Sequence, residues 1–251
     1  MKKWMVALAA AVMMAGMCNA EQAKGEAAKA KKVIKVAVIT GGHAFEKEGF
    51  LSVFEGQEGI EYTHLAQKDH SEIFEDINNW PYDVIVLYNM SQKITSNRQA
   101  NFVELLKRGV GVVALHHCIA AWSTWPEYRK IIGGKYYSRA VMENGVQKQQ
   151  SQYKHDVNVP VHIEDKTHPV MAGLSDFVLF DETYKYYDAE GDNKILLTTT
   201  EATSDKAIGW VRRYGKARVC YIQPGHGMET YKNENYRKLV GSAIRWSANK
   251  D

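Results

Sequence analysis

The chain has 251 residues, of which 45% are hydrophobic and 24% charged, and its formal net charge at pH 7 is +3. This length predicts one domain, and a net charge this close to zero gives no indication of a nucleic-acid-binding protein. The first 32 residues carry a net charge of +4, so the rest of the chain carries about −1. Evidence for function must therefore come from local motifs.

Residues 1–20 have the pattern of a secretory signal peptide. Two lysines precede an apolar run from Trp4 to Met17, and Cys18-Asn19-Ala20 supplies small residues for cleavage before Glu21. The run is too short to span a membrane. A lipoprotein with lipid on Cys18 is the alternative, which the bulky Met17 disfavours. We expect a periplasmic or secreted protein in which residues 21–32 form a disordered tether and residues 33–251 form one α/β domain.

The first half of this domain alternates strands with helices. Strands are expected at residues 33–40, 60–65, 83–88 and 110–115, and amphipathic helices at 45–54, 73–77 and 102–106. Ser71 is expected to cap the second helix, and Gly109 to end the third. The alternation predicts a flavodoxin-like α/β fold, which is a doubly wound, mostly parallel sheet with helices on both faces.

The second half begins with a helix that Thr124 caps and Glu127 closes as a capping box. The polar segment 136–154 has no clear period, and we expect an inserted loop with a binding role near the strand ends. Residues 157–163 alternate as an edge strand does, and further strands are expected at 177–180, 194–199, 207–212 and 218–223. Asn233 is expected to cap a closing amphipathic helix.

Four of the nine histidines, His43, His116, His117 and His226, come directly after predicted strands. The carboxyl ends of parallel strands meet at one edge, where open α/β sheets bind ligands. With a carboxylate, for which Glu182 is the candidate, imidazoles favour a divalent metal such as zinc. We therefore expect a metal at His116, His117, Glu182 and His226. A hydrogen-bonded structural pair of histidines is the alternative that the spacing leaves open.

Aromatic residues crowd the segments around the same edge, among them Trp122, Tyr136 and Tyr184. Rings with an apolar face and a polar tip suit the stacking of sugar rings. Packing in the core is the alternative, which we expect for at least half of them.

A series of longer motifs covers nearly the whole predicted domain. These are TGGH at 40–43, ALHHCIAAWSTWPEYRKIIGGKY at 114–136, YKHDV at 153–157, THPVMAGLSDF at 167–177, DETY at 181–184 and PGHGMETYKNENYRKLVGSAIRW at 224–246. In this order they resemble the trehalose-utilisation (ThuA-like) family. The resemblance implies a fold similar to class I glutamine amidotransferases and a role in sugar catabolism, often beside oxidoreductases that make 3-keto glycosides.

The chain departs from the amidotransferases at their nucleophile. Their elbow has the pattern G-x-C-x-G, whereas here the stretch is Ala114-Leu115-His116-His117-Cys118, which puts His116 at the elbow. Cys118 comes two residues late and lacks the flanking glycines that the tight turn needs. His226 is followed by Glu229 rather than by a glutamate two residues on. We therefore expect no glutaminase activity.

The function expected from these motifs is an exported enzyme that cleaves 3-keto glycosides as a hydrolase or lyase. The catalytic candidates are His116, His117, Glu182 and His226, and the candidates for substrate binding are His43, Trp122, Tyr136, His155 and Tyr184. We expect a small carbohydrate as the partner, with no nucleic acid and no membrane span, and the number of subunits, including a homo-oligomer, is left open. Two alternatives stay open, a non-catalytic carbohydrate-binding protein and a metal-free hydrolase that uses Cys118.

Overall fold

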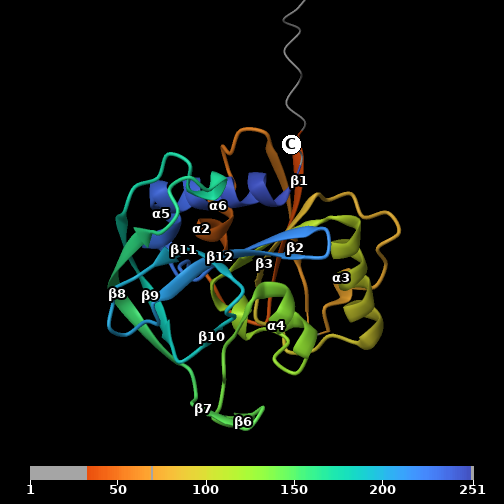
Figure 1. Cartoon of the computed structure of the whole chain (residues 1–251). Coiled ribbons are helices and arrows are strands. Elements are labelled where there is room, and N and C mark those ends of the chain that lie inside the picture. The colour runs from red at the N-terminus through yellow and green to blue at the C-terminus, as the bar shows by residue number, and fades with distance from the viewer. Residues whose placement is uncertain (1–32, 69, 250–251) are drawn as a thin grey trace, which may run out of the picture. The chain divides into compact units, whose positions relative to one another are not determined.

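One nine-stranded sheet organises the chain in the computed structural model (Figure 1), which describes residues 33–68 and 70–249. The predicted signal peptide and tether lie outside the described residues. The strands run, in order across the sheet, β2 (Ile60–Ala66), β1 (Ile34–Gly41), β3 (Val84–Asn89), β4 (Gly111–Leu115), β13 (Ala217–Ile222), β12 (Ala207–Tyr214), β11 (Lys194–Thr198), β8 (Gln152–Ile163) and β9 (Phe177–Lys185).

The first five strands of this order are parallel, and each strand after them pairs antiparallel with its neighbour. Their order across the sheet, with the second strand outside the first, is that of flavodoxin. The predicted α/β fold with a mostly parallel sheet is confirmed. Four antiparallel strands, β12, β11, β8 and β9, extend the sheet beyond its parallel half.

Helices cover both faces of the parallel half because its strands are apolar on both sides. Val36 and Val38 of β1 pack in a core with the helices α2 (Lys47–Ser52), α5 (Met228–Lys232) and α6 (Glu234–Ser247). Ala37 and Ile39 pack in the opposite core with α3 (Ser96–Arg108) and α4 (Pro126–Ile132). The side chain of Asn233 caps α6 as predicted, by accepting hydrogen bonds from two backbone N–H groups.

Two of the predicted helix starts are wrong. Among the described residues between β2 and β3, the helical structure is a 3-10 turn, Glu72–Phe74, and the side chain of Ser71 does not cap it. The Ser71 hydroxyl instead donates to the Lys93 carbonyl and accepts from the Trp122 indole, so tertiary partners hold it. The first residue before α4 is Trp125 rather than Thr124, and no side chain caps that helix.

The segments around β8 also differ from the prediction. Residues 157–163 belong to a longer strand that lies between β11 and β9, so β9 rather than β8 forms the edge. The expected loop at 136–154 contains a short hairpin, β6 (Val141–Glu143) and β7 (Val146–Lys148). Its turn residues Asn144 and Gly145 both have positive φ, which is the geometry that Asn-Gly favours in a two-residue hairpin. A further pair, β5 (Gly134–Lys135) and β10 (Asp188–Ala189), lies beside it.

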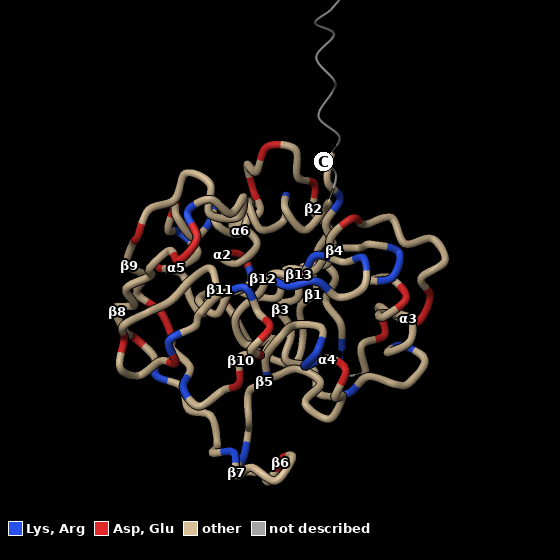
Figure 2. The backbone as a smooth tube through the Cα atoms, viewed as in Figure 1, with Lys and Arg blue, Asp and Glu red and all other residues tan. Residues whose placement is uncertain are grey.

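Lys and Arg are interspersed with Asp and Glu along the chain (Figure 2). Within residues 33–68 and 70–249, no helix is long and apolar enough to cross a membrane. Two 3-10 turns complete the described elements, His116–Ala120 after β4 and Pro169–Met171 before β9.

Candidate functional site

The predicted histidines meet at one edge of the sheet because three of the parallel strands end there. His43 follows β1, His116 and His117 follow β4, and His226 follows β13. Glu182 and Tyr184 reach the same place from inside β9, which the sequence pattern did not predict to be a strand this long. A cavity of about 410 Å³ opens between these segments. It is lined by His43, Met90, His117, Ala120, Tyr136, Ser138, Gln150, Tyr153, His155, Glu182, Tyr184 and His226.

His116 occupies the elbow after β4 in a left-handed backbone conformation, with φ 51°. For a residue other than glycine this conformation costs about 1–3 kcal/mol and persists only where neighbouring contacts enforce it. The Tyr221 hydroxyl donates to the His116 carbonyl over 3.1 Å, and His116 Nδ1 lies 2.8 Å from the Gln223 carbonyl. The ring is fully buried. The elbow that carries cysteine in amidotransferases therefore aims an imidazole at this site.

Three ligand atoms converge beside this elbow. His116 Nε2 lies 2.9 Å from Glu182 Oε2 and 3.2 Å from His226 Nδ1, and Glu182 Oε2 lies 3.0 Å from His226 Nδ1. Ligands about 2.0–2.1 Å from a tetrahedral zinc ion are separated from one another by about 3.3 Å. His116, Glu182 and His226 therefore have nearly the spacing that a zinc ion needs on one face of its coordination shell.

The hydrogen bonds of His116 require a further proton or a metal ion between its ring and Glu182. Its Nδ1 must carry a hydrogen, because the Gln223 carbonyl can only accept. In a neutral imidazole Nε2 then presents a lone pair to the Glu182 carboxylate, 2.9 Å away. Two lone pairs at this distance repel each other unless a second proton or a metal ion lies between the two atoms. A histidine that donates its other N–H to a backbone carbonyl is also the usual arrangement of a metal ligand.

The electrostatics of the two neighbouring groups agree with a bound cation. Burial alone would raise the pKa of Glu182, but hydrogen bonds with His116 and His226 outweigh it and hold this pKa well below its ordinary value. The hydrogen bond with Glu182 raises the pKa of His226, against the effect of burial. The carboxylate is thus charged at neutral pH and attracts any cation that enters.

His117 does not join this group of three, although the sequence predicted it as a metal ligand. Its ring lies 4.7 Å from the ring of His43 and lines the cavity, and it is only 4% exposed. Neither of its nitrogens has a partner in hydrogen-bonding geometry among the described residues. Burial, and then the nearby His116 and His43, lower the pKa of His117 well below the ordinary value, so this imidazole is neutral.

Asp181 organises the turn that carries His226, and the sequence analysis did not identify it. Its buried carboxylate accepts hydrogen bonds from the backbone N–H groups of Glu182, Gly225 and His226, at 2.8, 2.6 and 2.8 Å. Gly225 has φ 137°, and a Cβ there would lie 2.4 Å from the Tyr236 hydroxyl, so only glycine fits. The DETY motif contains Asp181, but nothing in the sequence pairs it with the distant turn.

A β-bulge brings His155 to the cavity. The pairing of β8 with β9 shifts between Lys154 and Val157, and Asp156 has φ 58°. Such bulges redirect side chains beside active sites. The His155 ring lies 4.6 Å from that of His226, and its Nδ1 is 3.7 Å from Glu182 Oε1. This gap is too long for a hydrogen bond.

Among the predicted sugar-binding aromatics, two line the cavity and one does not. The Tyr184 hydroxyl lies 2.9 Å from His116 Nε2, and the Tyr136 ring packs edge-on against it. Burial raises the pKa of Tyr136 to about 12, so its hydroxyl stays protonated. Trp122 is fully buried and does not line this cavity, so it has no ring face for a sugar here. It packs against Phe74 and Tyr128 in the core.

Cys118 lies in the core beneath the elbow and is fully buried. Burial raises the pKa of its thiol far above the range in which a thiolate forms. This arrangement disfavours a nucleophilic role for the cysteine.

A family model described as trehalose utilisation matches residues 29–247. Two solved ThuA-like proteins have similar folds, one from Parabacteroides merdae (TM-score 0.73, 20% identity, 87% of this chain and 91% of that chain) and one from Bacteroides uniformis (0.62, 22%, 90% and 96%). A cytoplasmic protein from Salmonella typhimurium is similar at TM-score 0.57 and 13% identity, over 85% of this chain and 99% of its own. None of the curated proteins matches. With the histidine motifs, the match over most of its length shows that this chain belongs to the trehalose-utilisation (ThuA) family.

Proposed function

We propose that this protein is a sugar-processing enzyme that cleaves 3-keto glycosides at the cavity, with a divalent metal held by His116, Glu182 and His226. The observation that carries the proposal is the contact between His116 Nε2 and Glu182 Oε2, which needs a second proton or a metal ion, in a group of three ligand atoms with nearly the spacing of a zinc site. Membership of a trehalose-utilisation family supports a sugar as the substrate. The cavity of about 410 Å³ has a volume within the range of small-molecule sites.

The chemistry follows from the carbonyl group of such a substrate. A carbonyl at C3 makes the proton on C2 acidic, so a base can remove it. The electron pair left on C2 forms a C1=C2 double bond as the C1–O bond breaks, and the departing oxygen takes up a proton. Addition of water across this double bond completes a hydrolysis. A metal ion bound at the three ligands would supply an electrophile that polarises the carbonyl.

The residues around the cavity have the properties that these steps need. The neutral ring of His117 has no partner in hydrogen-bonding geometry among the described residues, so it is our candidate for the base. Burial, and then the charge of Glu182, raise the pKa of Tyr184 well above its ordinary value, so its hydroxyl remains a hydrogen-bond donor. His155 lies at the open side, where it can contact a ligand hydroxyl beside Glu182 Oε1.

The test is incubation of the purified protein with a 3-keto disaccharide and, separately, with its unoxidised parent, with products followed by NMR. We expect cleavage of the keto sugar alone, stimulated by added zinc or another divalent ion after chelation. Glu182→Gln should abolish it. His162→Ala is the matched control, because this half-exposed histidine forms an ion pair with Asp176 and does not line the cavity. Equal activity of the chelated enzyme, or no turnover of any keto glycoside, would rule out this function.

A further inference from the structure

A short arm, residues 138–150 with the β6–β7 hairpin, projects from the body of the molecule (Figure 1). Two of its apolar side chains face solvent, since Met142 is 65% and Val146 is 55% exposed. An isolated two-stranded hairpin is only marginally stable in water. The arm therefore needs contacts with the body of the molecule to hold one position.

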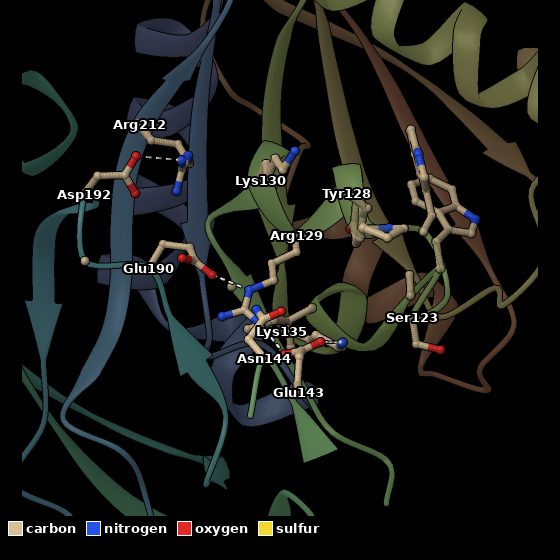
Figure 3. A pocket seen from close by; sticks show the side chains of 17 residues that line it. Ser123, Tyr128, Arg129, Lys130, Lys135, Glu143, Asn144, Glu190, Asp192 and Arg212 are labelled. Atoms are coloured by element: carbon tan, nitrogen blue, oxygen red, sulfur yellow. Dashed lines mark hydrogen bonds and ion pairs between the residues drawn. The ribbon is translucent and has the colours of Figure 1, made fainter. Parts of the chain in front are cut away.

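Arg129 of α4 supplies these contacts. Its guanidinium binds three carboxylates, Glu143 at 2.5 Å, Asp188 at 2.9 Å and Glu190. In Figure 3 the Arg129 side chain lies between Glu190 and Glu143, on the wall of a second hollow. Glu143 belongs to the arm, whereas Asp188 and Glu190 belong to the body. The side chain of Arg129 therefore binds carboxylates of both the arm and the body.

Two lysines complete the cluster. Lys135 binds Glu143 at 2.5 Å, and Lys148 of the arm binds Asp188 at 2.8 Å. The charged side chains of the cluster are only about one-fifth to one-third exposed. Charge-assisted hydrogen bonds that are partly shielded from water are stronger than ordinary surface ion pairs. We call these residues, Arg129, Lys135, Glu143, Lys148, Asp188 and Glu190, the anchor cluster.

The anchor cluster is connected to the cavity through two adjacent tyrosines. The Tyr137 hydroxyl lies 2.6 Å from the carboxylates of both Glu143 and Asp188, while its neighbour Tyr136 lines the cavity. Ser138 and Gln150, at the two ends of the arm, line it as well. The backbone N–H of Tyr137 donates to the Ser151 hydroxyl, which fixes the two ends to each other. A shift of the arm would therefore move one wall of the cavity.

We propose that the arm is the specificity wall of this cavity and that Arg129 is the positioning residue that fixes it. The cavity-lining groups of Tyr136, Ser138 and Gln150 are uncharged hydroxyl and amide groups. Such groups can both donate hydrogen bonds to the hydroxyls of a sugar and accept them. The sugar preference rests on the proposed function, whereas the anchoring of the arm does not.

Hydrogen exchange followed by mass spectrometry tests the anchoring without any substrate. Arg129→Met and Glu143→Ala should speed exchange of amides in residues 138–150 at least about 10-fold, the factor expected for one lost charge-assisted hydrogen bond. Glu190→Ala is the matched control, because Glu190 also binds Arg129 but does not contact the arm. It should leave the exchange of the arm unchanged. Wild-type exchange in Glu143→Ala, or equal acceleration in Glu190→Ala, would overturn the anchoring role.

Kinetics on the 3-keto disaccharide then tests the specificity wall. Glu143→Ala should raise KM about 10-fold with little change in kcat, and bound zinc should stay at the wild-type level. Gln150→Ala, which keeps the anchor cluster, should raise KM in the same way. If the wild-type enzyme turns over no keto glycoside, the proposed function fails while the exchange result still decides the anchoring. Equal KM values in turnover-competent variants would show that the arm does not select the sugar.

Discussion

His116 and His117 are adjacent in the chain, but their rings have different surroundings, and this difference predicts different roles. His116 Nε2 lies beside Glu182 and His226. His117 lines the cavity, and neither of its nitrogens has a partner in hydrogen-bonding geometry among the described residues. The centroids of the two rings lie 5.4 Å apart, and their planes are inclined by 60°. One ring is suited to hold a cation and the other to contact substrate.

Metal binding separates these roles. Alanine at His116 or His226, or glutamine at Glu182, should weaken zinc binding by roughly 100-fold or more, because each change removes one ligand. His117→Ala should keep zinc at the wild-type level but lose turnover. Metal content after dialysis and calorimetric titration with zinc measure both effects, with His162→Ala as the control. Loss of zinc in His117→Ala would place that ring among the ligands after all.

His168 should make the stability of the fold depend on pH. Its Nδ1 accepts a hydrogen bond from the Val170 N–H, so this nitrogen must be unprotonated in the folded protein. Burial, and then the charge of Lys194, lower the pKa of His168 below 6.5. The unfolded chain therefore binds the proton more readily, and stability that is present above pH 6.5 is lost as the pH falls below it.

The measurement is the urea midpoint at pH 7.5 and pH 5.5. In His168→Asn the midpoint should fall less, since asparagine can accept the same hydrogen bond without titrating. Part of the fall should remain, because the pKa of His64 is also lowered, first by burial and then by Lys47. An unchanged pH dependence in His168→Asn would assign it to other groups.

At the level of single residues, the sequence identified the candidate metal ligands better than the residues that hold those ligands in place. His116 and His226 could be predicted because each follows a recognisable strand of a parallel sheet. Asp181 could not, since its role depends on three backbone N–H groups, two of them more than forty residues away. Trp122 was expected to bind sugar because an aromatic motif does not reveal which ring faces the core.

Among the elements, β9 has the largest effect on the site. Periodicity predicted only its start, because Asp181, Glu182 and Thr183 are polar yet buried. They are buried because the segment after β13 covers this part of β9. The Gln223 side chain donates to the Glu182 carbonyl, and the Thr230 hydroxyl donates to the Phe180 carbonyl. Such contacts between distant segments leave no local pattern in the sequence.

Asp181 joins β9 to the segment after β13 by accepting hydrogen bonds from the backbone N–H groups of Gly225 and His226. Asp181→Ala should lower the free energy of unfolding by about 2–5 kcal/mol, because it leaves three backbone N–H groups without their acceptor. It should also weaken zinc binding through displacement of His226. Asp176→Ala is the control and should cost much less, since the ion pair of Asp176 with His162 is half-exposed to solvent. Urea unfolding measures both, and equal losses would show that Asp181 is an ordinary surface contact.

Across the whole molecule, the parallel half and the antiparallel half contribute different parts of the site. The parallel strands β1, β4 and β13 supply the histidines, and their alternation with helices made this half predictable from periodicity. The antiparallel half supplies Glu182, Tyr184 and His155, and the shape of the cavity depends on how β8 and β9 fold back. The fold class was therefore predictable, whereas the composition of the cavity wall was not.

Export would also expose the whole molecule to an oxidising environment. Its two described cysteines are buried, which protects their thiols from oxidation. Cys118 packs in the core with α3 and α4, and Cys220 packs in the core on the other face of the sheet, so the two cannot pair. Burial raises the pKa of Cys220 to about 12, and that of Cys118 further, so neither thiol forms the reactive thiolate at neutral pH.

We therefore predict that protein recovered from the periplasm begins at Glu21 and carries two thiols that react with a maleimide only after unfolding. The start follows from the signal-peptide pattern of residues 1–20, and the protected thiols follow from burial on opposite faces of the sheet. Intact-mass measurement before and after labelling, in native buffer and in guanidinium, gives both answers. A diacylglyceryl group on Cys18 would show a lipoprotein, and retention of residues 1–20 would exclude cleavage. Rapid labelling of the native protein would mean that one face of the sheet opens far more readily than its packing implies.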